Sequence, residues 1–161
     1  MKDITESGHL VRDDLFCVEM AGLKSGYLIN KGDIIFKSRG NLNTAALVSE
    51  DLDKTIAASP LMVLKIKGKN VLPDYLAWYI NQPAAQKQLE SKAGGTSVRM
   101  ISIADLGDLV VEAPSLDGQK KIVAFAELMK REEAILKELS NKRKKLYDAV
   151  LMKSATIKEK K

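Results

Sequence analysis

The sequence of 161 residues contains one cysteine, Cys17, and one histidine, His9, and these scarcities exclude several classes of protein. A single cysteine cannot form an internal disulfide, and one cysteine with one histidine cannot supply the ligands of a structural zinc site. Apolar runs are far shorter than the roughly 20 residues of a membrane span, and the N-terminus lacks the apolar core of a signal peptide. We therefore expect a cytoplasmic protein without structural zinc or membrane contact.

Signatures of the common catalytic and cofactor sites are also missing. The chain has no phosphate-binding glycine loop, no dinucleotide-binding glycine pattern, no HExxH and no GxSxG. The acidic stretch 50–53 could hold a divalent cation, but such short acidic loops are usually solvated turns. We therefore predict a non-catalytic protein with no cofactor and no metal, while an enzyme of unrecognised type stays open as the weakest hypothesis.

The residues that are present predict a folded globular chain, because 45% are hydrophobic and 29% are charged. The net charge of +5 is unevenly distributed along the sequence. Residues 1–118 carry 13 basic and 15 acidic side chains, whereas residues 119–161 carry 13 basic and 6 acidic ones. A basic C-terminal element can bind phosphates or an acidic protein surface, or it can be an ordinary solvated helix face.

The first two thirds of the chain mix strand and helix signals. Short strands are expected at 27–29, 33–37, 45–48, 61–66 and 109–111, with the first two forming a hairpin around a turn at 30–32. Helices are expected from Pro73 to Pro83, from Pro83 to about Lys92, and for one turn after Ser102, where Asp105 completes a capping box. Without regular alternation of strands and helices, this order predicts an irregular α+β domain.

The last third predicts one long helix of the coiled-coil type, from about Asp117 to Met152. Apolar residues step by alternating three and four, with charged Glu132 and Arg143 in the same series. The apolar members are Ile122, Phe125, Met129, Leu136, Leu139, Leu146 and Val150. Such a helix would extend about 50 Å, too far for a small domain to cover, so we expect it to need a partner helix. A helix folded back entirely on its own domain stays open as the alternative.

Two polar loops have the residue types that read DNA. Arginine and lysine contact guanine edges and phosphates, asparagine contacts adenine, and hydroxyls contact either. The candidate DNA contacts are Lys37, Arg39, Asn41, Asn43 and Thr44 in the first loop and Thr96, Ser97 and Arg99 in the second. Taken alone, each loop could equally be a plain surface turn, because turn residues and recognition residues overlap.

The order of motifs resembles the DNA-specificity (S) subunits of Type I restriction–modification systems over about residues 27–152. The motifs are Lys31–Ile35, Ser38–Asn41, Tyr75–Asn81, Gly94–Ser97, Ala104–Leu109 and Ala113–Val123. The most specific is the Pro-x-Leu-x-x-Gln-x-x-Ile signature, made by Pro114, Leu116, Gln119 and Ile122. The chain departs from the family pattern at Gly118, where an acidic residue is usual, and it contains one repeat where a full S subunit has two.

The resemblance implies a target recognition domain at 1–116, a spacer and dimerisation helix at 117–155, and a basic disordered tail at 156–161. In that family, the recognition domain reads one half of a split DNA site, methyltransferase subunits bind the S subunit, and the long helices pair. The implied partners are double-stranded DNA, a methyltransferase subunit, and a second copy that forms a homodimer through antiparallel helices. A second hypothesis is a truncated relative that binds a methyltransferase or another S subunit without reading DNA.

Overall fold

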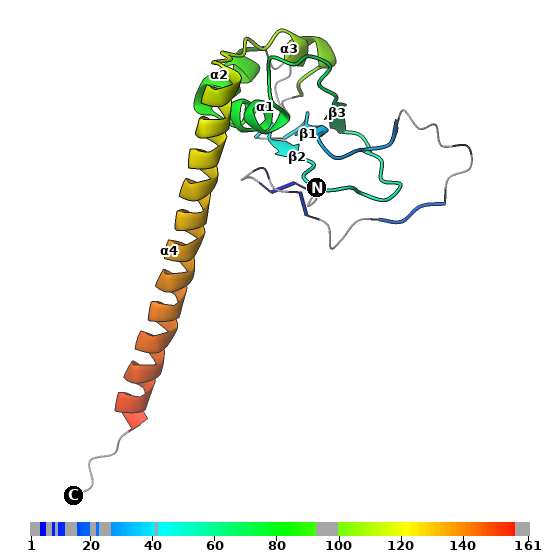
Figure 1. The fold of residues 1–161 in the computed structure, drawn as a ribbon. Coiled ribbons are helices and arrows are strands. Elements are labelled where there is room, and N and C mark those ends of the chain that lie inside the picture. Colours follow the sequence, from blue (N-terminus) through cyan, green and yellow to red (C-terminus); the bar gives the residue numbers. More distant parts are fainter. Residues whose placement is uncertain are drawn as a thin grey trace, which may run out of the picture. The chain divides into compact units, whose positions relative to one another are not determined.

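The computed structural model describes residues 4–5, 8, 10–11, 16–19, 22, 27–40, 42–92 and 100–156. The chain divides into two compact units, Met1–Lys120 and Lys121–Lys161. The first unit contains a small sheet and short helices, and the second contains most of one long helix (Figure 1). Within the described residues, no helix is both long and apolar enough to cross a bilayer.

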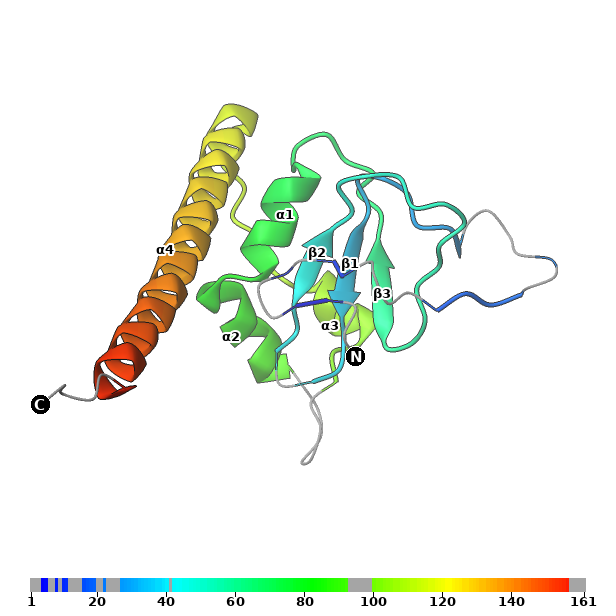
Figure 2. The ribbon, with the colours of Figure 1, turned by 90° about the horizontal axis from the view of Figure 1, so that it is seen from below.

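The sheet has three antiparallel strands: β1 (Ile34–Lys37), β2 (Ala45–Leu47) and β3 (Leu61–Leu64). Their order is β2-β1-β3, which Figure 2 shows with the strands side by side. Ile34 is the partner of Leu47 on one side and of Leu64 on the other. The predicted strand, loop and strand over 33–48 is therefore confirmed, as is a strand within 61–66.

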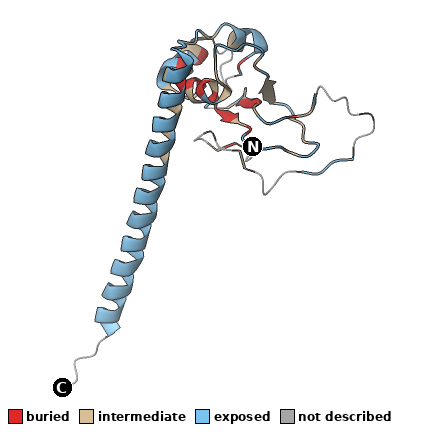
Figure 3. Ribbon diagram, viewed as in Figure 1, coloured by how far each residue is buried: buried red, intermediate tan, exposed pale blue. Residues whose placement is uncertain are grey.

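Alternating side chains of β1 enter two cores, because successive residues of a strand point to opposite faces. Ile34 and Phe36 pack with Ala77, Ile80 and other residues of the helical segments. On the opposite face, the cluster of buried residues contains Ile4, Ile29, Ile35, Ala46 and Val48. Figure 3 shows the buried residues concentrated in this sheet and the adjoining helices. The central strand is thus fixed from both faces.

Four helices follow the sheet: α1 (Pro73–Ile80), α2 (Pro83–Lys92), α3 (Ile103–Gly107) and α4 (Leu116–Thr156). Proline begins α1 and α2, at positions where its missing N–H costs no intrahelical hydrogen bond. Ser102 and Asp105 form the predicted capping box of α3. The α+β fold with one long C-terminal helix is confirmed, while the expected basic tail lies, apart from Thr156, outside the described residues.

The predicted hairpin of 27–29 with 33–37 is wrong. Leu28 makes an isolated bridge with Ile56, and the Ile29 N–H donates to the Thr55 carbonyl at 2.9 Å. The intervening turn is closed by the Asp33 carboxylate, which accepts from the Asn30 N–H at 2.9 Å. Lys65 Nζ lies 3.0 Å from the same carboxylate. Residues 27–29 therefore pair with Thr55 and Ile56 rather than with residues 33–37. β1 pairs with the later strands β2 and β3 instead.

The predicted strand at 109–111 is also wrong, because other groups take its backbone hydrogen bonds. The Gln88 side-chain amide accepts from the Val110 N–H at 3.1 Å and donates to the Val110 carbonyl at 3.2 Å. The Tyr75 hydroxyl donates to the carbonyl of Glu112. Leu109 packs against the helical core, so the apolar residues of this segment reflect packing rather than strand pairing.

Candidate nucleic-acid interface

The first predicted DNA-reading loop, residues 38–44, connects β1 to β2 and is closed at its base. The Lys37 N–H donates to the Thr44 carbonyl at 2.9 Å, and Asn43 Nδ2 donates to the Lys37 carbonyl at 3.1 Å. Ser38 is buried, and its hydroxyl donates to the Pro60 carbonyl at 2.6 Å. Arg39, Gly40 and Leu42 are the described residues between these contacts, and hydrogen bonds therefore hold the backbone on either side of them.

Two cationic side chains, Lys37 and Arg39, lie at this end of the sheet. Arg39 is exposed, and Lys37 is half-buried along the loop. Gly40 has φ +134°, and a Cβ placed there would lie 3.1 Å from Lys37 Cε. Only glycine adopts such a backbone readily, so Gly40 allows the loop to turn beneath the lysine side chain.

The structure places Asn43 and Thr44 in the interior, where 3% and 5% of each residue is exposed. The Asn43 amide is used inside the loop, and the Asn43 carbonyl accepts from Gln86 Nε2 of α2 at 2.9 Å. The structure thus separates the predicted residues of this loop into outward-facing cations and inward-facing polar groups.

The segment that follows the second predicted loop pairs with the start of the first loop. Arg39 forms an isolated antiparallel bridge with Met100, and the Ile101 N–H donates to the Ser38 carbonyl at 2.8 Å. Met100 directly follows the second loop in the sequence, and it is the residue that the structure places beside Arg39. The predicted contacts Asn41, Thr96, Ser97 and Arg99 themselves lie outside the described residues.

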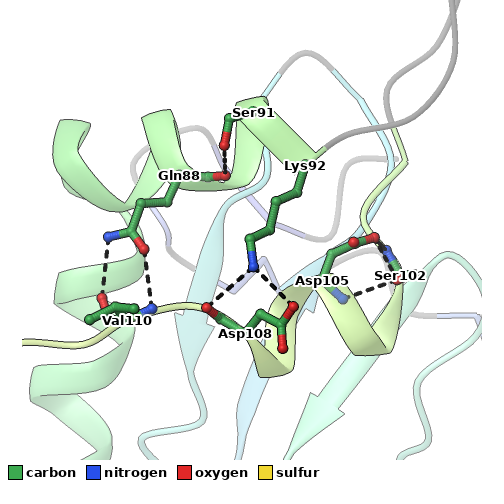
Figure 4. Close-up of polar contacts among 7 residues, drawn as sticks. All are labelled: Gln88, Ser91, Lys92, Ser102, Asp105, Asp108 and Val110. Atoms are coloured by element: carbon green, nitrogen blue, oxygen red, sulfur yellow. Dashed lines mark hydrogen bonds and ion pairs between the residues drawn. The ribbon is translucent and has the colours of Figure 1, made fainter.

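The segments on either side of 93–99 are held by polar contacts between α2 and the residues that directly follow α3 (Figure 4). Lys92 Nζ lies 3.1 Å from the carboxylate of Asp108. One turn earlier on α2, the Gln88 amide binds the backbone of Val110. These two contacts hold the C-terminal end of α2 beside the segment that follows α3.

The capping box of α3 predicts a measurable effect of pH. The hydrogen bond from the Ser102 hydroxyl holds the pKa of the Asp105 carboxyl below its ordinary value of 3.8. Because the folded pKa is lowered, the stabilisation is complete above pH 3.8 and is lost as the pH falls through the folded value. We expect Ser102→Ala to raise the Asp105 pKa toward 3.8 in a carboxyl-carbon NMR titration. Ser91→Ala is the control, and an unchanged Asp105 pKa in Ser102→Ala would contradict this role.

Two amide side chains that we did not predict as functional fix the loop from the helical side. Asn81 Oδ1 accepts from the Ala45 N–H, and its Nδ2 donates to the Ala45 carbonyl, both at 2.8 Å. Gln86 supports the loop through Asn43. Asn81 is the last residue of the Tyr75–Asn81 motif and directly follows α1. Its position at a helix end is the sequence feature that could have predicted this supporting role.

Gln119, in the signature that opens α4, is fully buried. Its Oε1 accepts from the Leu72 N–H at 2.8 Å, next to the start of α1. Its Nε2 donates to the carbonyls of Asn70 and Pro114, each at 2.8 Å. One amide thus ties the first turn of α4 to the segment before α1, which explains why glutamine occupies this position.

The predicted dimerisation residues all lie on α4. Ile122 is half-buried, and the others each expose more than half of their surface. The exposed members are Phe125, Met129, Leu136, Leu139, Leu146 and Val150. A single helix has no interior, so the face that carries these side chains needs another surface to become buried.

Residues 16–144 match the family described as Type I restriction modification DNA specificity domain. Among solved structures, the chain is similar to the HsdS subunit from Thermoanaerobacter tengcongensis, with a TM-score of 0.72 and 26% sequence identity. The match covers 95% of this chain and 40% of that one, so the chain spans less than half of the HsdS length. No curated protein matches the chain.

Proposed function

The chain belongs to the family of Type I restriction modification DNA specificity domains, and from this premise we propose that it reads one half of a two-part site in double-stranded DNA. The family is one of DNA recognition rather than catalysis, as we predicted from the missing catalytic motifs. In this proposal, residues 1–116 are the recognition domain and residues 117–155 are the spacer helix. The protein would act in the cytoplasm and need no cofactor or metal.

The observation that carries the proposal is the exposed Arg39 on a loop whose ends are held by part-buried hydrogen bonds. A rigid support lowers the entropy lost when a side chain is ordered against a base edge. The proposed DNA contacts are Lys37, Arg39, Asn41, Thr96, Ser97 and Arg99. We assign buried Asn43 and Thr44 to holding the loop, since their side chains have almost no exposed surface.

The same proposal gives α4 two tasks: to pair with α4 of a second copy and to help position methyltransferase subunits. The exposed apolar face of the helix supports the pairing. A chain that spans 40% of HsdS would need a second recognition unit to read a two-part site. The alternative, a module that binds a methyltransferase or another S subunit without reading DNA, also uses this face.

Replacing Arg39 by alanine tests the reading of DNA. Loss of an arginine that reads a base should weaken binding to the preferred sequence by about 1–3 kcal/mol, roughly 5- to 150-fold, and relax the preference at one position. The probe is a duplex selected by the wild-type protein from a randomised pool, with affinity measured by fluorescence anisotropy. The control is Lys67→Ala, since Lys67 is exposed and follows the end of β3 remote from Lys37.

The salt dependence of binding separates DNA reading from the alternative module. Each neutralised phosphate should contribute about −0.9 to the slope of log affinity against log salt concentration. For the wild type, we expect a steep slope. For Lys37→Ala, we expect weaker binding to all sequences and an unchanged base preference. A flat slope, or equal affinity of wild type and Arg39→Ala at low salt, would favour the module over DNA reading.

A further inference from the structure

The face of α4 that carries the apolar residues also carries two charges of opposite sign. Glu132 and Arg143 occupy positions in the same three-and-four series, and both are exposed. A shallow groove on the helix brings Arg143 beside Leu136, Leu139 and Tyr147, and its lining also includes Ser140, Lys144 and Asp148. Charged residues at such positions commonly specify the register and partner of paired helices, because an unpaired charge there is costly to bury.

The two possible directions of pairing treat these charges differently. In a parallel pair of two copies, each residue of the series faces its own counterpart, so carboxylate meets carboxylate and guanidinium meets guanidinium. In an antiparallel pair with the two-fold axis between Lys137 and Glu138, Glu132 faces Arg143 of the partner subunit. The symmetry repeats this contact on the other side of the axis, so both charged positions are neutralised.

The same axis pairs six of the seven apolar positions with one another, while Ile122 faces Lys153 of the partner subunit. Leu136 faces Leu139 of the partner subunit, Met129 faces Leu146 of the partner subunit, and Phe125 faces Val150 of the partner subunit. Each of these side chains exposes more than half of its surface on the isolated helix. Leu128 and Ile135, also exposed, directly precede Met129 and Leu136 and widen the apolar face.

A slip by one heptad destroys this match in either direction. In one direction, Glu132 would face Leu136 of the partner subunit and Arg143 would face Phe125 of the partner subunit. In the other, Glu132 would face Val150 of the partner subunit and Arg143 would face Leu139 of the partner subunit. Every slipped register therefore places charges against apolar side chains, where they lose water without gaining a partner.

The conformation of Arg143 in the single chain is compatible with this contact. Its Nη2 donates to the Tyr147 hydroxyl at 3.2 Å, and its guanidinium carbon lies 5.9 Å from the centre of that ring. A guanidinium has five N–H donors, so the tyrosine leaves donors for a carboxylate. The ring also limits the rotamers of the arginine, which lowers the entropy lost on pairing.

The family resemblance already implies antiparallel pairing of α4 with α4 of a second copy. Beyond that pairing, we propose that Glu132 with Arg143 of the partner subunit selects the register whose axis lies between Lys137 and Glu138. The inference rests on the proposed function, which supplies the dimer. In this register, the Gln119 residues of the two copies lie about 55 Å apart along the helices. A heptad slip changes that separation by about 10 Å, close to three base pairs, so Glu132 and Arg143 determine half-site spacing.

Charge reversal in the full-length chain tests the register. We expect Glu132→Arg and Arg143→Glu each to raise the dimer dissociation constant at least about tenfold, since like charges would then face each other twice. The double variant E132R/R143E restores opposite charges and should dimerise within about threefold of wild type. Sedimentation equilibrium measures the dimer dissociation constants of the wild type, the two single variants and the double variant. Glu127→Arg, a reversal on the exposed outer face, is the control and should leave the constant unchanged.

Cysteine cross-linking reads the register directly, in a Cys17→Ser background. Met129→Cys mixed with Leu146→Cys should form an interchain disulfide under mild oxidation, whereas Met129→Cys mixed with Leu139→Cys should not. A wild-type dimer that is insensitive to charge reversal, or that cross-links at the second pair, would overturn the register and leave the dimer intact. A strictly monomeric wild type would instead overturn the dimer of the proposed function, and the register with it.

Discussion

Replacement of Gln119 by leucine is expected to lower the free energy of unfolding by about 3 kcal/mol. The amide is fully buried and makes three hydrogen bonds, to the Leu72 N–H and to the carbonyls of Asn70 and Pro114. Leucine fills a similar volume but offers no donor or acceptor, and each buried group left unpaired costs about 1–3 kcal/mol. Asn70 and Pro114 are exposed residues whose carbonyls can gain water, which keeps the expected loss near 3 kcal/mol.

Urea denaturation followed by circular dichroism measures this loss as a lower midpoint with an unchanged slope. Lys120→Ala is the matched control, since Lys120 is the next residue and is exposed. A surface change of this kind should stay within about 0.5 kcal/mol of wild type. If Gln119→Leu unfolds at the same urea concentration as Lys120→Ala, the glutamine does not hold the start of α4 in solution.

Sequence patterns predicted the elements that local chemistry specifies. The prolines that open α1 and α2, and the serine and aspartate that cap α3, act within one turn of helix. The alternating series of α4 is likewise a property of consecutive residues, and the predicted length of the helix followed from how far that series continues. These features do not depend on distant parts of the chain, so one sequence was sufficient to place them.

The incorrect predictions concern segments whose backbone partners are distant in the sequence. Residues 27–29 have strand composition, but their partners are near Thr55 and Ile56. Val110 is a β-branched residue in an apolar run, but its N–H and carbonyl are bound by Gln88 on α2. Composition indicates that a segment is packed, whereas the identity of its hydrogen-bond partner depends on the tertiary fold.

The candidate site shows the same division. Glycine and asparagine mark turns, and they predicted the connection between two strands that carries Arg39, whereas Lys37 is the last residue of β1. The inward direction of Asn43 and the supporting role of Gln86 depend on how α2 packs beside that loop, which the sequence pattern does not contain. Polar residues that build a loop and polar residues that contact a ligand have the same composition.

Asn81→Ala tests whether this side chain supports the loop, and it should lower the free energy of unfolding by about 2 kcal/mol. Ala45 is the partner of Phe36, and its backbone N–H and carbonyl point outward from the sheet toward the Asn81 amide. Alanine leaves both groups without a partner at a residue that is 1% exposed. Each unpaired group costs about 1 kcal/mol or more, so the free energy of unfolding should fall and the geometry of the adjoining loop should change.

Hydrogen exchange distinguishes this specific contact from general destabilisation. In wild type, the Ala45 N–H is bound by Asn81 Oδ1 at 2.8 Å, and its exchange should require opening of that contact. In Asn81→Ala, the Ala45 amide should exchange faster by a larger factor than the amide of Ile35, which lies on the central strand. Asn70→Ala removes an exposed asparagine side chain and should change neither amide. Equal acceleration at Ala45 and Ile35 would mean that Asn81 contributes only to global stability and does not hold the first residue of β2 at the end of the proposed DNA-reading loop.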